Sequence, residues 1–261
     1  MENGIKGLGA SAPTEIDEGE TFAKCETVLR EDNLKWLIGR EIESLDKIST
    51  DLRNRMFMTP AARAGIDIAL YDAFALFNNV PLVDLLGRQY EALPTSITIG
   101  IKSIEESLEE AHEYGRRGFK IIKLKTGASV EEDVARITKL RESIGQSIAI
   151  SVDANQGYDT KDYKKFIKDT QELNVEFVEQ PFPKKNIDQM RSLEEQCKAH
   201  VAADESLQNE EDAALIAKPP KACGIFNIKL MKSGGIYSAM KIATIACLLY
   251  TSDAADERSS V

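Results

Sequence analysis

Five charged residues follow short apolar runs of the sequence at a nearly constant interval. In chain order they are Lys125, Asp153, Glu179, Asp204 and Lys229, and the intervals between them are 28, 26, 25 and 25 residues. One charged residue after a buried strand needs no explanation, but five in succession indicate a site to which each repeat of the fold contributes a side chain. Three carboxylates between two amines indicate acid–base chemistry around a cation.

The acidic part of this set consists of Asp153, Glu179 and Asp204. Three carboxylates that converge repel one another unless a cation neutralises them. Hard oxygen ligands suit Mg²⁺, or Mn²⁺, better than Zn²⁺, and the two histidines lie far apart in the sequence. The sequence therefore predicts a magnesium site. The alternative is that these residues are ordinary strand-end caps or salt-bridge partners of Lys123.

Two lysines lie in the run I-I-K-L-K-T-G, residues 121–127. Alternate residues of a strand point the same way, so Lys123 and Lys125 share one face. We expect Lys125 and Lys229 to form an acid/base pair on either side of the metal, and Lys123 to lower the pKa of Lys125 as a like charge. The alternative is an edge strand whose solvated lysines prevent aggregation.

A metal between two bases fits the removal of a proton next to a carboxylate. The metal would bind the substrate carboxylate and hold the enediolate that forms when the α-proton leaves. A base on one face and an acid on the other would invert the carbon, which is epimerisation. If only one face is used, the same intermediate can instead lose a group or close a ring.

The elements that must position these residues form a repeat. From about residue 93, apolar runs alternate with amphipathic helical segments, and the second of these segments starts with a predicted capping box at Ser129 and Glu132. A repeated β-α unit predicts a parallel sheet with helices outside it, and the intervals suit a (β/α)8 barrel, whose active sites lie at the carboxyl ends of the strands. The expected strands are 95–101, 120–125, 148–153, 175–179, 200–204 and 224–230, and the expected helices are 104–116, 130–143, 160–172, 186–198, 209–217 and 235 onward.

The first 91 residues have a different pattern, which is mainly helical. Helical periodicity extends over about 20–43, and Thr59 followed by Pro60 predicts the start of a helix that ends near Phe77. The Gly-rich residues 4–12 lack the third glycine of a dinucleotide-binding loop, so we interpret them as a strand and turn.

Composition limits the partners and the location. The 261 residues carry a formal net charge of -10, which argues against nucleic acid and anionic membranes as partners. The four cysteines form no C-x-x-C pair, which is typical of a reducing, cytoplasmic location. The sequence has neither a visible signal peptide nor an apolar run long enough for a membrane helix.

These motifs together resemble the enolase superfamily, specifically its muconate-cycloisomerase-like subgroup. The matching motifs are K-L-K (123–125), V-D-A-N-Q-G-Y (152–158), V-E-Q-P (178–181), A-D-E-S (203–206) and N-I-K-L-M-K-S-G-G-I (227–236). The resemblance implies Asp153, Glu179 and Asp204 as Mg²⁺ ligands, Lys125 and Lys229 as the acid/base pair, with Lys123 beside them.

Within the subgroup, the motifs look most like dipeptide epimerases of the L-Ala-D/L-Glu type. The resemblance implies a small-molecule substrate, a dipeptide, and an enzyme that is a homo-oligomer when full length. It also implies an α/β fold: a partial α+β capping domain over residues 1–91 and an incomplete TIM-type barrel, units 1 to 6, over 92–246. On the same site, the alternatives are a muconate-type cycloisomerase or an o-succinylbenzoate synthase.

The two ends depart from the family pattern. The chain begins inside the cap region, and residues 247–261 match the translation of a sequencing-library adapter, so we expect them to be a non-native read-through tail. The acidic D-x-D motif that the resemblance implies on the eighth strand is absent. Because six strands cannot close an eight-stranded barrel, a further alternative is a non-catalytic fragment that aggregates or is inactive.

Overall fold

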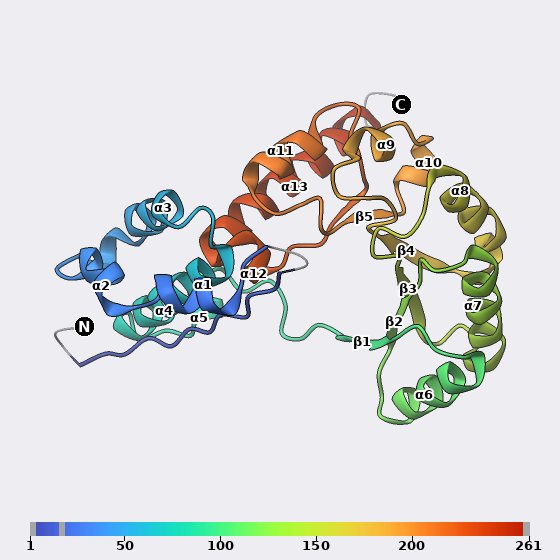
Figure 1. Ribbon diagram of the computed structural model, residues 1–261, viewed down its shortest axis with the longest axis horizontal. Coiled ribbons are helices and arrows are strands. Elements are labelled where there is room, and N and C mark those ends of the chain that lie inside the picture. The colour runs from blue at the N-terminus through green and yellow to red at the C-terminus, as the bar shows by residue number, and fades with distance from the viewer. Residues whose placement is uncertain (1–3, 16–18, 258–261) are drawn as a thin grey trace. The chain divides into compact units, whose positions relative to one another are not determined.

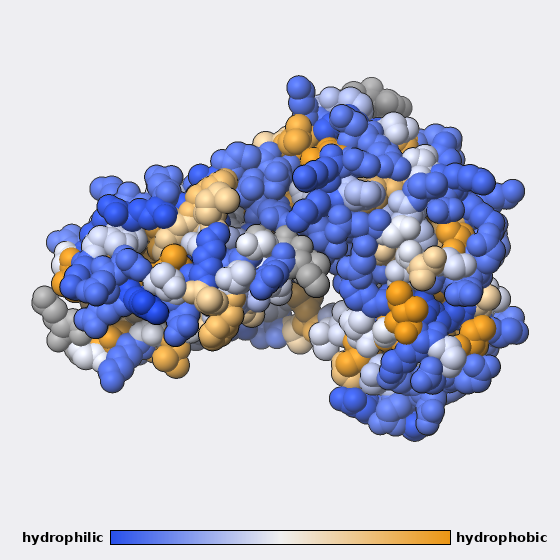
Figure 2. Space-filling model, in the orientation of Figure 1, coloured by the Kyte–Doolittle hydropathy of each residue, from blue (hydrophilic) through white to orange (hydrophobic). Residues whose placement is uncertain are grey.

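A computed structural model describes residues 4–15 and 19–257 of the chain. They divide into two compact units, which Figure 1 shows with their elements labelled. Of the described residues, the first unit contains 4–15, 19–91, 208–215 and 228–257, and the second contains 92–207 and 216–227. On the face shown in Figure 2, hydrophilic residues cover most of each unit and apolar residues form small scattered groups.

The second unit is built on a six-stranded parallel sheet whose strands lie in sequence order, β1 to β6. The predicted β-α repeat is confirmed by this topology, and the helices after the first three strands cover one face of the sheet (Figure 1). The strands are β1 Ser96–Ile99, β2 Ile121–Lys125, β3 Ala149–Asp153, β4 Val175–Glu179, β5 Val201–Ala203 and β6 Ile225–Phe226. The helices are α6 Ile104–Arg116, α7 Val130–Ile144, α8 Thr160–Asp169, η3 Gln171–Leu173, α9 Ile187–Arg191 and α10 Glu195–Lys198.

The register of the sheet aligns the residues that the sequence analysis selected. Lys125 pairs with Asp153, and Asp153 pairs with Glu179. Neighbouring residues of a parallel sheet point to the same face, so these three side chains share one end and one face of the sheet. On β2, Ile122 and Leu124 are fully buried on the opposite face.

The predictions for residues 224–230 and 186–198 were wrong. The strand expected over 224–230 ends at Phe226, so Lys229 does not end a strand but is the N-cap residue of α12, Leu230–Ser233. A helix was expected over 186–198, but two short helices, α9 and α10, form instead. In both cases the apolar residues that suggested one continuous element are divided between a short element and the turn beside it.

The capping predictions were partly correct. Ser129 accepts a hydrogen bond from the backbone N–H of Glu132, as expected. The reciprocal capping box, however, lies one helix earlier, where Ser103 and Glu106 each bond the backbone of the other. Both motifs satisfy amide groups that the first turn of a helix leaves unpaired.

The first unit is mainly helical and packs around α4. Its elements are α1 Phe22–Val28, α2 Glu31–Leu34, η1 Lys35–Leu37, η2 Ile42–Ser44, α3 Leu45–Arg55, α4 Pro60–Phe77, α5 Leu82–Leu85, α12 and α13 Ile236–Glu257, and α11, Glu210–Ala217, starts in this unit. Leu52, Ile66 and Cys25 form one apolar cluster, and Tyr71 and Ile236 belong to a second. Of the predicted non-native tail, residues 247–257 continue α13, and 258–261 lie outside the described residues.

The N-terminus of α4 is capped by a distant carboxylate rather than by Thr59. Glu20, which is fully buried, accepts hydrogen bonds from the backbone N–H groups of Ala61 and Ala62 at 2.8 and 3.2 Å. The Thr59 hydroxyl instead donates to the carbonyl of Met56. A negative charge at a helix N-terminus is favourable because it faces the positive end of the helix dipole.

Replacing Glu20 by alanine should therefore destabilise the first unit. We expect Glu20→Ala to lower the free energy of unfolding by about 1–3 kcal/mol, because two buried amide groups lose their acceptor. The matched control, Thr59→Ala, removes only one long hydrogen bond and should cost less than about 1 kcal/mol. Urea unfolding followed by circular dichroism measures both, and a larger loss in the Thr59 variant would contradict this interpretation.

Candidate active site

Three buried carboxylates lie at the carboxyl ends of neighbouring strands. Asp153 ends β3, Glu179 ends β4, and Asp204 follows the last residue of β5. Their exposed fractions are 1%, 2% and 3%. Buried carboxylates need charge-assisted partners, so their surroundings decide what this end of the sheet can do.

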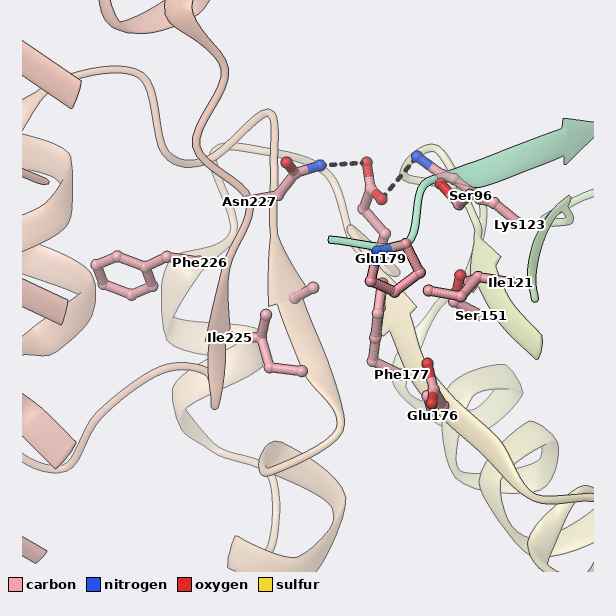
Figure 3. A pocket seen from close by; sticks show the side chains of 12 residues that line it. Ser96, Ile121, Lys123, Ser151, Glu176, Phe177, Glu179, Ile225, Phe226 and Asn227 are labelled. Carbon is pink, nitrogen blue, oxygen red and sulfur yellow. Dashed lines mark hydrogen bonds and ion pairs between the residues drawn. The ribbon is translucent and has the colours of Figure 1, made fainter. Parts of the chain in front are cut away.

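The ammonium group of Lys123 lies between two of these carboxylates. Its Nζ is 2.8 Å from Asp153 Oδ2 and 2.7 Å from Glu179 Oε2. Figure 3 shows Glu179 between Lys123 and Asn227, whose side-chain amide donates to Glu179 Oε1 at 2.9 Å. The salt bridges that the sequence analysis left as an alternative for Lys123 are therefore present.

Lys125 lies closer to the strand end and is more exposed. Its Nζ contacts Asp153 Oδ2 at 2.8 Å and donates to Asn155 Oδ1 at 2.6 Å. One third of its side chain is exposed, against 18% for Lys123. Of the two lysines, Lys125 is thus the more accessible at the strand ends, whereas Lys123 lines the cavity beside them.

The lysines and carboxylates change one another's pKa. Burial raises the pKa of Asp153, but hydrogen bonds from Lys123 and Lys125 outweigh it and hold this pKa below its usual range. For Glu179, burial, the charge of Asp153 and a hydrogen bond with Asp204 outweigh Lys123 and leave the pKa raised. Burial lowers the pKa of Lys123, but its two carboxylate partners outweigh burial and leave this pKa raised, so Lys123 is a protonated ammonium group.

A cavity of about 330 Å³ lies along the same face of the sheet, on the side of the strands that carries Lys123. Its lining includes Ile121, Ser151, Phe177 and Glu179, which alternate along their strands with residues of the opposite face. In Figure 3 these side chains gather around the space, whereas Phe226 points away from Glu179. The interior is therefore mixed: an apolar wall below a charged end.

Sequence reasoning missed Gln180, which positions the carboxylate of the next strand. Its Oε1 accepts from the backbone N–H groups of Asp204 and Ser206 at 2.9 and 3.0 Å. Its Nε2 donates to the carbonyl of Phe182 and to the Ser206 hydroxyl. Gln180 is fully buried and has a left-handed φ of 37°. The signal was its place in V-E-Q-P, directly after a buried strand end.

A fourth carboxyl, Glu205, was also missed. It is buried beside the cluster, and its Oε1 lies 3.4 Å from the side-chain amide nitrogens of Asn155 and Gln156. Burial and the negative charges of Asp204 and Asp153 raise its pKa. Four buried acidic groups, Asp153, Glu179, Asp204 and Glu205, therefore lie at one end of the sheet.

The donor set fits a hard divalent cation, although the carboxylates are not already arranged as a cage. Among the residues that the structure describes, no three acidic, histidine or cysteine side chains meet the geometry of a metal site. The carboxylates of Asp153 and Glu179 are turned to Lys123 instead. The repulsion that raises the pKa of Glu179 is what a cation relieves, and carboxylate oxygens are the ligands Mg²⁺ prefers.

Of the predicted site residues, the structure brings together Lys123, Lys125, Asp153, Glu179 and Asp204. Lys229 lies in the first unit, where it has an extended backbone and its carbonyl accepts from the N–H of Ser233. The pairing of Lys229 with Lys125 stays a prediction.

Comparison with known proteins places the chain in a family. Residues 106–250 match the family described as "Enolase C-terminal domain-like", and residues 1–87 match "Mandelate racemase / muconate lactonizing enzyme, N-terminal domain". The chain belongs to the enolase superfamily, as a member with both of these domains.

Several proteins that are similar to this chain in sequence are named as dipeptide epimerases. The chain is 45% identical over 244 residues to the L-Lys-D/L-Arg epimerase of Methylococcus capsulatus, with 94% of this chain and 68% of that protein aligned. It is 32% identical over 247 residues to the L-Ala-D/L-Glu epimerase of Clostridium acetobutylicum, with 94% and 69% aligned. A crystal structure of the Methylococcus capsulatus dipeptide epimerase complexed with Mg ion superposes with a TM-score of 0.94 at 44% identity, covering 95% of this chain and 72% of that one.

Removing Lys123 should expose the repulsion between its two carboxylates. We expect Lys123→Met to lower the free energy of unfolding by about 2–4 kcal/mol at neutral pH without added metal. The loss should shrink near about pH 4, because the pKa values of Asp153 and Glu179 rise once the ammonium is gone and both groups become neutral.

Lys139→Met is the matched control, since Lys139 forms only an exposed pair with Glu142. It should change stability by less than about 0.5 kcal/mol at either pH. Chemical denaturation at the two pH values measures both variants. A Lys123 variant whose loss is the same at both would show that the lysine acts through packing rather than charge.

Proposed function

We propose that this chain carries out Mg²⁺-dependent epimerisation of dipeptides. The observation that carries the proposal is the register of Lys125, Asp153 and Glu179, which sets an accessible amine beside two buried carboxylates at one strand end. The relatives named dipeptide epimerases support it.

Asp153, Glu179 and Asp204 would hold the metal. When bound, Mg²⁺ supplies positive charge that polarises the substrate carboxylate and acidifies the adjacent α-proton. Lys123 would lose its bridging role and remain beside Asp153, while Gln180 keeps the Asp204 backbone in place.

The two remaining lysines would move the protons. Lys125, as the neutral amine, takes the α-proton and becomes an ammonium ion. Lys229, as an ammonium ion, donates a proton to the opposite face of the same carbon and becomes neutral. One proton is removed and one returned, so the carbon is inverted without a change in composition. For the other stereoisomer the roles of the two lysines are exchanged.

The substrate class that we propose is a dipeptide with a basic second residue. The relative at 45% identity is named for L-Lys-D/L-Arg, whereas the relative named for L-Ala-D/L-Glu is 32% identical. The formal net charge of -10 also attracts cationic molecules. Turnover of Lys-Arg, Ala-Glu, muconate and the cyclohexadiene substrate of o-succinylbenzoate synthase would separate the candidates.

The location and the assembly of the protein are also part of the proposal. In the described part of the chain, no helix is long and apolar enough to cross a membrane. We propose a cytoplasmic protein, supported by four cysteines of which none is paired in a disulfide among the described residues. A homo-oligomer and the domain limits 1–91, 92–246 and 247–261 rest on the family resemblance.

Replacing either lysine should abolish proton exchange from one stereoisomer. We expect Lys125→Ala and Lys229→Ala each to lower α-proton exchange from one of the two epimers by about 10²–10⁴-fold, because each removes the only base on one face. Proton NMR of each epimer in D₂O measures the exchange, with Lys139→Ala as the surface control. Full exchange of both epimers in either variant would rule out the assignment. No exchange by the unaltered chain would favour a non-catalytic fragment.

The carboxylates should determine metal affinity. We expect Glu179→Gln and Asp204→Asn to weaken Mn²⁺ binding by at least about 10-fold, since each replaces a charged ligand by a neutral one. Asp188→Asn is the control because its side chain is fully exposed in the same unit. Titration calorimetry gives the affinities. If Glu179→Gln and Asp204→Asn bind Mn²⁺ as tightly as Asp188→Asn does, the metal is not held by Glu179 and Asp204.

A further inference from the structure

Each lysine of the proposed acid/base pair is followed in the chain by a backbone segment that one buried aspartate and one buried arginine bind. One pair is Asp133 and Arg136, on α7 of the second unit. The other is Arg63 and Asp67, on α4 of the first unit. All four side chains are at most 4% exposed. Ionised groups are rarely buried without a specific use for their charge, and the contacts of these four side chains show which atoms they bind.

Arg136 and Asp133 hold the backbone around Lys125. Arg136 Nη2 donates to the carbonyl oxygen of Lys125, and also to Asp133 Oδ1 at 3.0 Å. Asp133 Oδ2 accepts from the backbone N–H of Gly127 at 2.9 Å and from the hydroxyl of Tyr158 at 2.8 Å. The arginine thus holds a carbonyl of the segment, and the aspartate holds an amide two residues later.

The turn after Lys125 fits this arrangement only with glycine. Gly127 has a φ of 101°, and a Cβ placed on it would lie 2.2 Å from the carbonyl oxygen of Ala154. The amide of the intervening Thr126 donates to the carbonyl of Asp153 at 2.8 Å. The end of β2 is therefore fixed from both sides, by the sheet and by the Asp–Arg pair.

Arg63 and Asp67 each bind the backbone that follows Lys229. Arg63 Nη2 and Nε donate to the carbonyl oxygens of Ser233 and Gly234 at 2.8 and 3.2 Å. Asp67 Oδ2 accepts from the backbone N–H of Tyr237 at 3.1 Å. Again the arginine holds carbonyl groups and the aspartate holds an amide further along.

This turn also depends on glycine, here on two. Gly234 and Gly235 have φ values of 79° and 117°. A Cβ on Gly234 would lie 2.0 Å from the Arg63 guanidinium, and one on Gly235 would lie 2.4 Å from Asp67 Oδ2. The turn connects directly to the lysine, because Ser233 N–H donates to the Lys229 carbonyl at 2.9 Å through the single turn of α12.

We infer that each lysine of the acid/base pair has its own buried Asp–Arg clamp, Asp133–Arg136 for Lys125 and Arg63–Asp67 for Lys229. These four residues are positioning residues: they touch backbone, and they act on the reaction through the lysine that follows from it. The inference rests on the proposed function for its catalytic part. The hydrogen bonds to the two lysine segments exist whether or not the reaction is the one proposed.

Variants of the two clamps should affect different stereoisomers, because each lysine exchanges the α-proton of one stereoisomer. Lysine in place of arginine keeps the charge but reaches fewer carbonyl groups than the planar guanidinium. A base displaced by about 1 Å can lose about 10²-fold in rate. We therefore expect Arg63→Lys to lower α-proton exchange from the epimer that Lys229→Ala abolishes by about 10–100-fold, and to leave the other epimer within about 3-fold. Arg136→Lys should do the reverse.

Arg141→Lys is a matched control from α7. Arg141 is also buried and also binds backbone carbonyls, including those of Gly145, Ile148 and Leu173, which lie before the amino ends of β3 and β4. Its loss should reduce stability without favouring one epimer. The isosteric variants Asp67→Asn and Asp133→Asn test the clamps again if an arginine variant does not fold.

Backbone amide hydrogen exchange gives a readout that needs no turnover. We expect Arg63→Lys to lower protection at residues 229–237 by about 10-fold while 121–127 stay unchanged, and Arg136→Lys to do the opposite. Local loss at the matching segment supports the clamps. A uniform loss, or none, would overturn the inference. If the unaltered chain exchanges no α-proton from any dipeptide, the proposed function fails, and amide exchange alone decides whether the clamps exist. If exchange occurs but both arginine variants slow both epimers equally, the function stands and the inference fails.

Discussion

The parallel sheet concentrates buried carboxylates at one end of its strands, and positive charge must balance them there. Asp153 and Glu179 are nearly inaccessible to water, and the ammonium group of Lys123 between them balances part of their charge. Glu205 adds a further acidic group beside Asp204 and Asp153. A region with this much negative charge is built to receive positive charge, from the protein's lysines and from a cation.

The sheet converts a one-dimensional spacing into this cluster. Parallel strands in register bring Lys125, Asp153 and Glu179 to one edge and one face. Hydrogen bonds then fix the backbone around the site. Gln180 binds the backbone N–H of Asp204, and the positive φ angles of Gly127 and Gly234 allow buried arginines to bind backbone carbonyl groups near these turns. The positions of the reacting side chains are therefore set by hydrogen bonds to the backbone that carries them.

Much of this could be read from the sequence, and the reasons for the rest are physical. The period of the apolar runs predicted six parallel strands, and the charged residue at the end of each run predicted Lys125, Asp153 and Glu179 at one edge of the sheet. The contribution of Glu20 to the start of α4 could not be predicted, because it joins residues 41 positions apart through a fold not yet known. Likewise, Asp133 binds the backbone of Gly127, a contact for which the sequence offers no residue-type pattern, whereas Gln180 could be noticed only by its place in V-E-Q-P. Lys229 was assigned to a strand end because the apolar run continues beyond Phe226, although the strand itself stops there.

We expect the carboxylates at the strand ends to bind one divalent cation together. A crystal of the chain soaked in Mn²⁺, with diffraction data measured at the manganese absorption edge, tests this binding without any assay of activity. We expect one strong anomalous peak with oxygen atoms of Asp153, Glu179 and Asp204 at about 2.0–2.3 Å, and the ammonium group of Lys123 moved away from at least one carboxylate. A peak bound by other residues, or no peak while Lys123 still bridges Asp153 and Glu179, would contradict it.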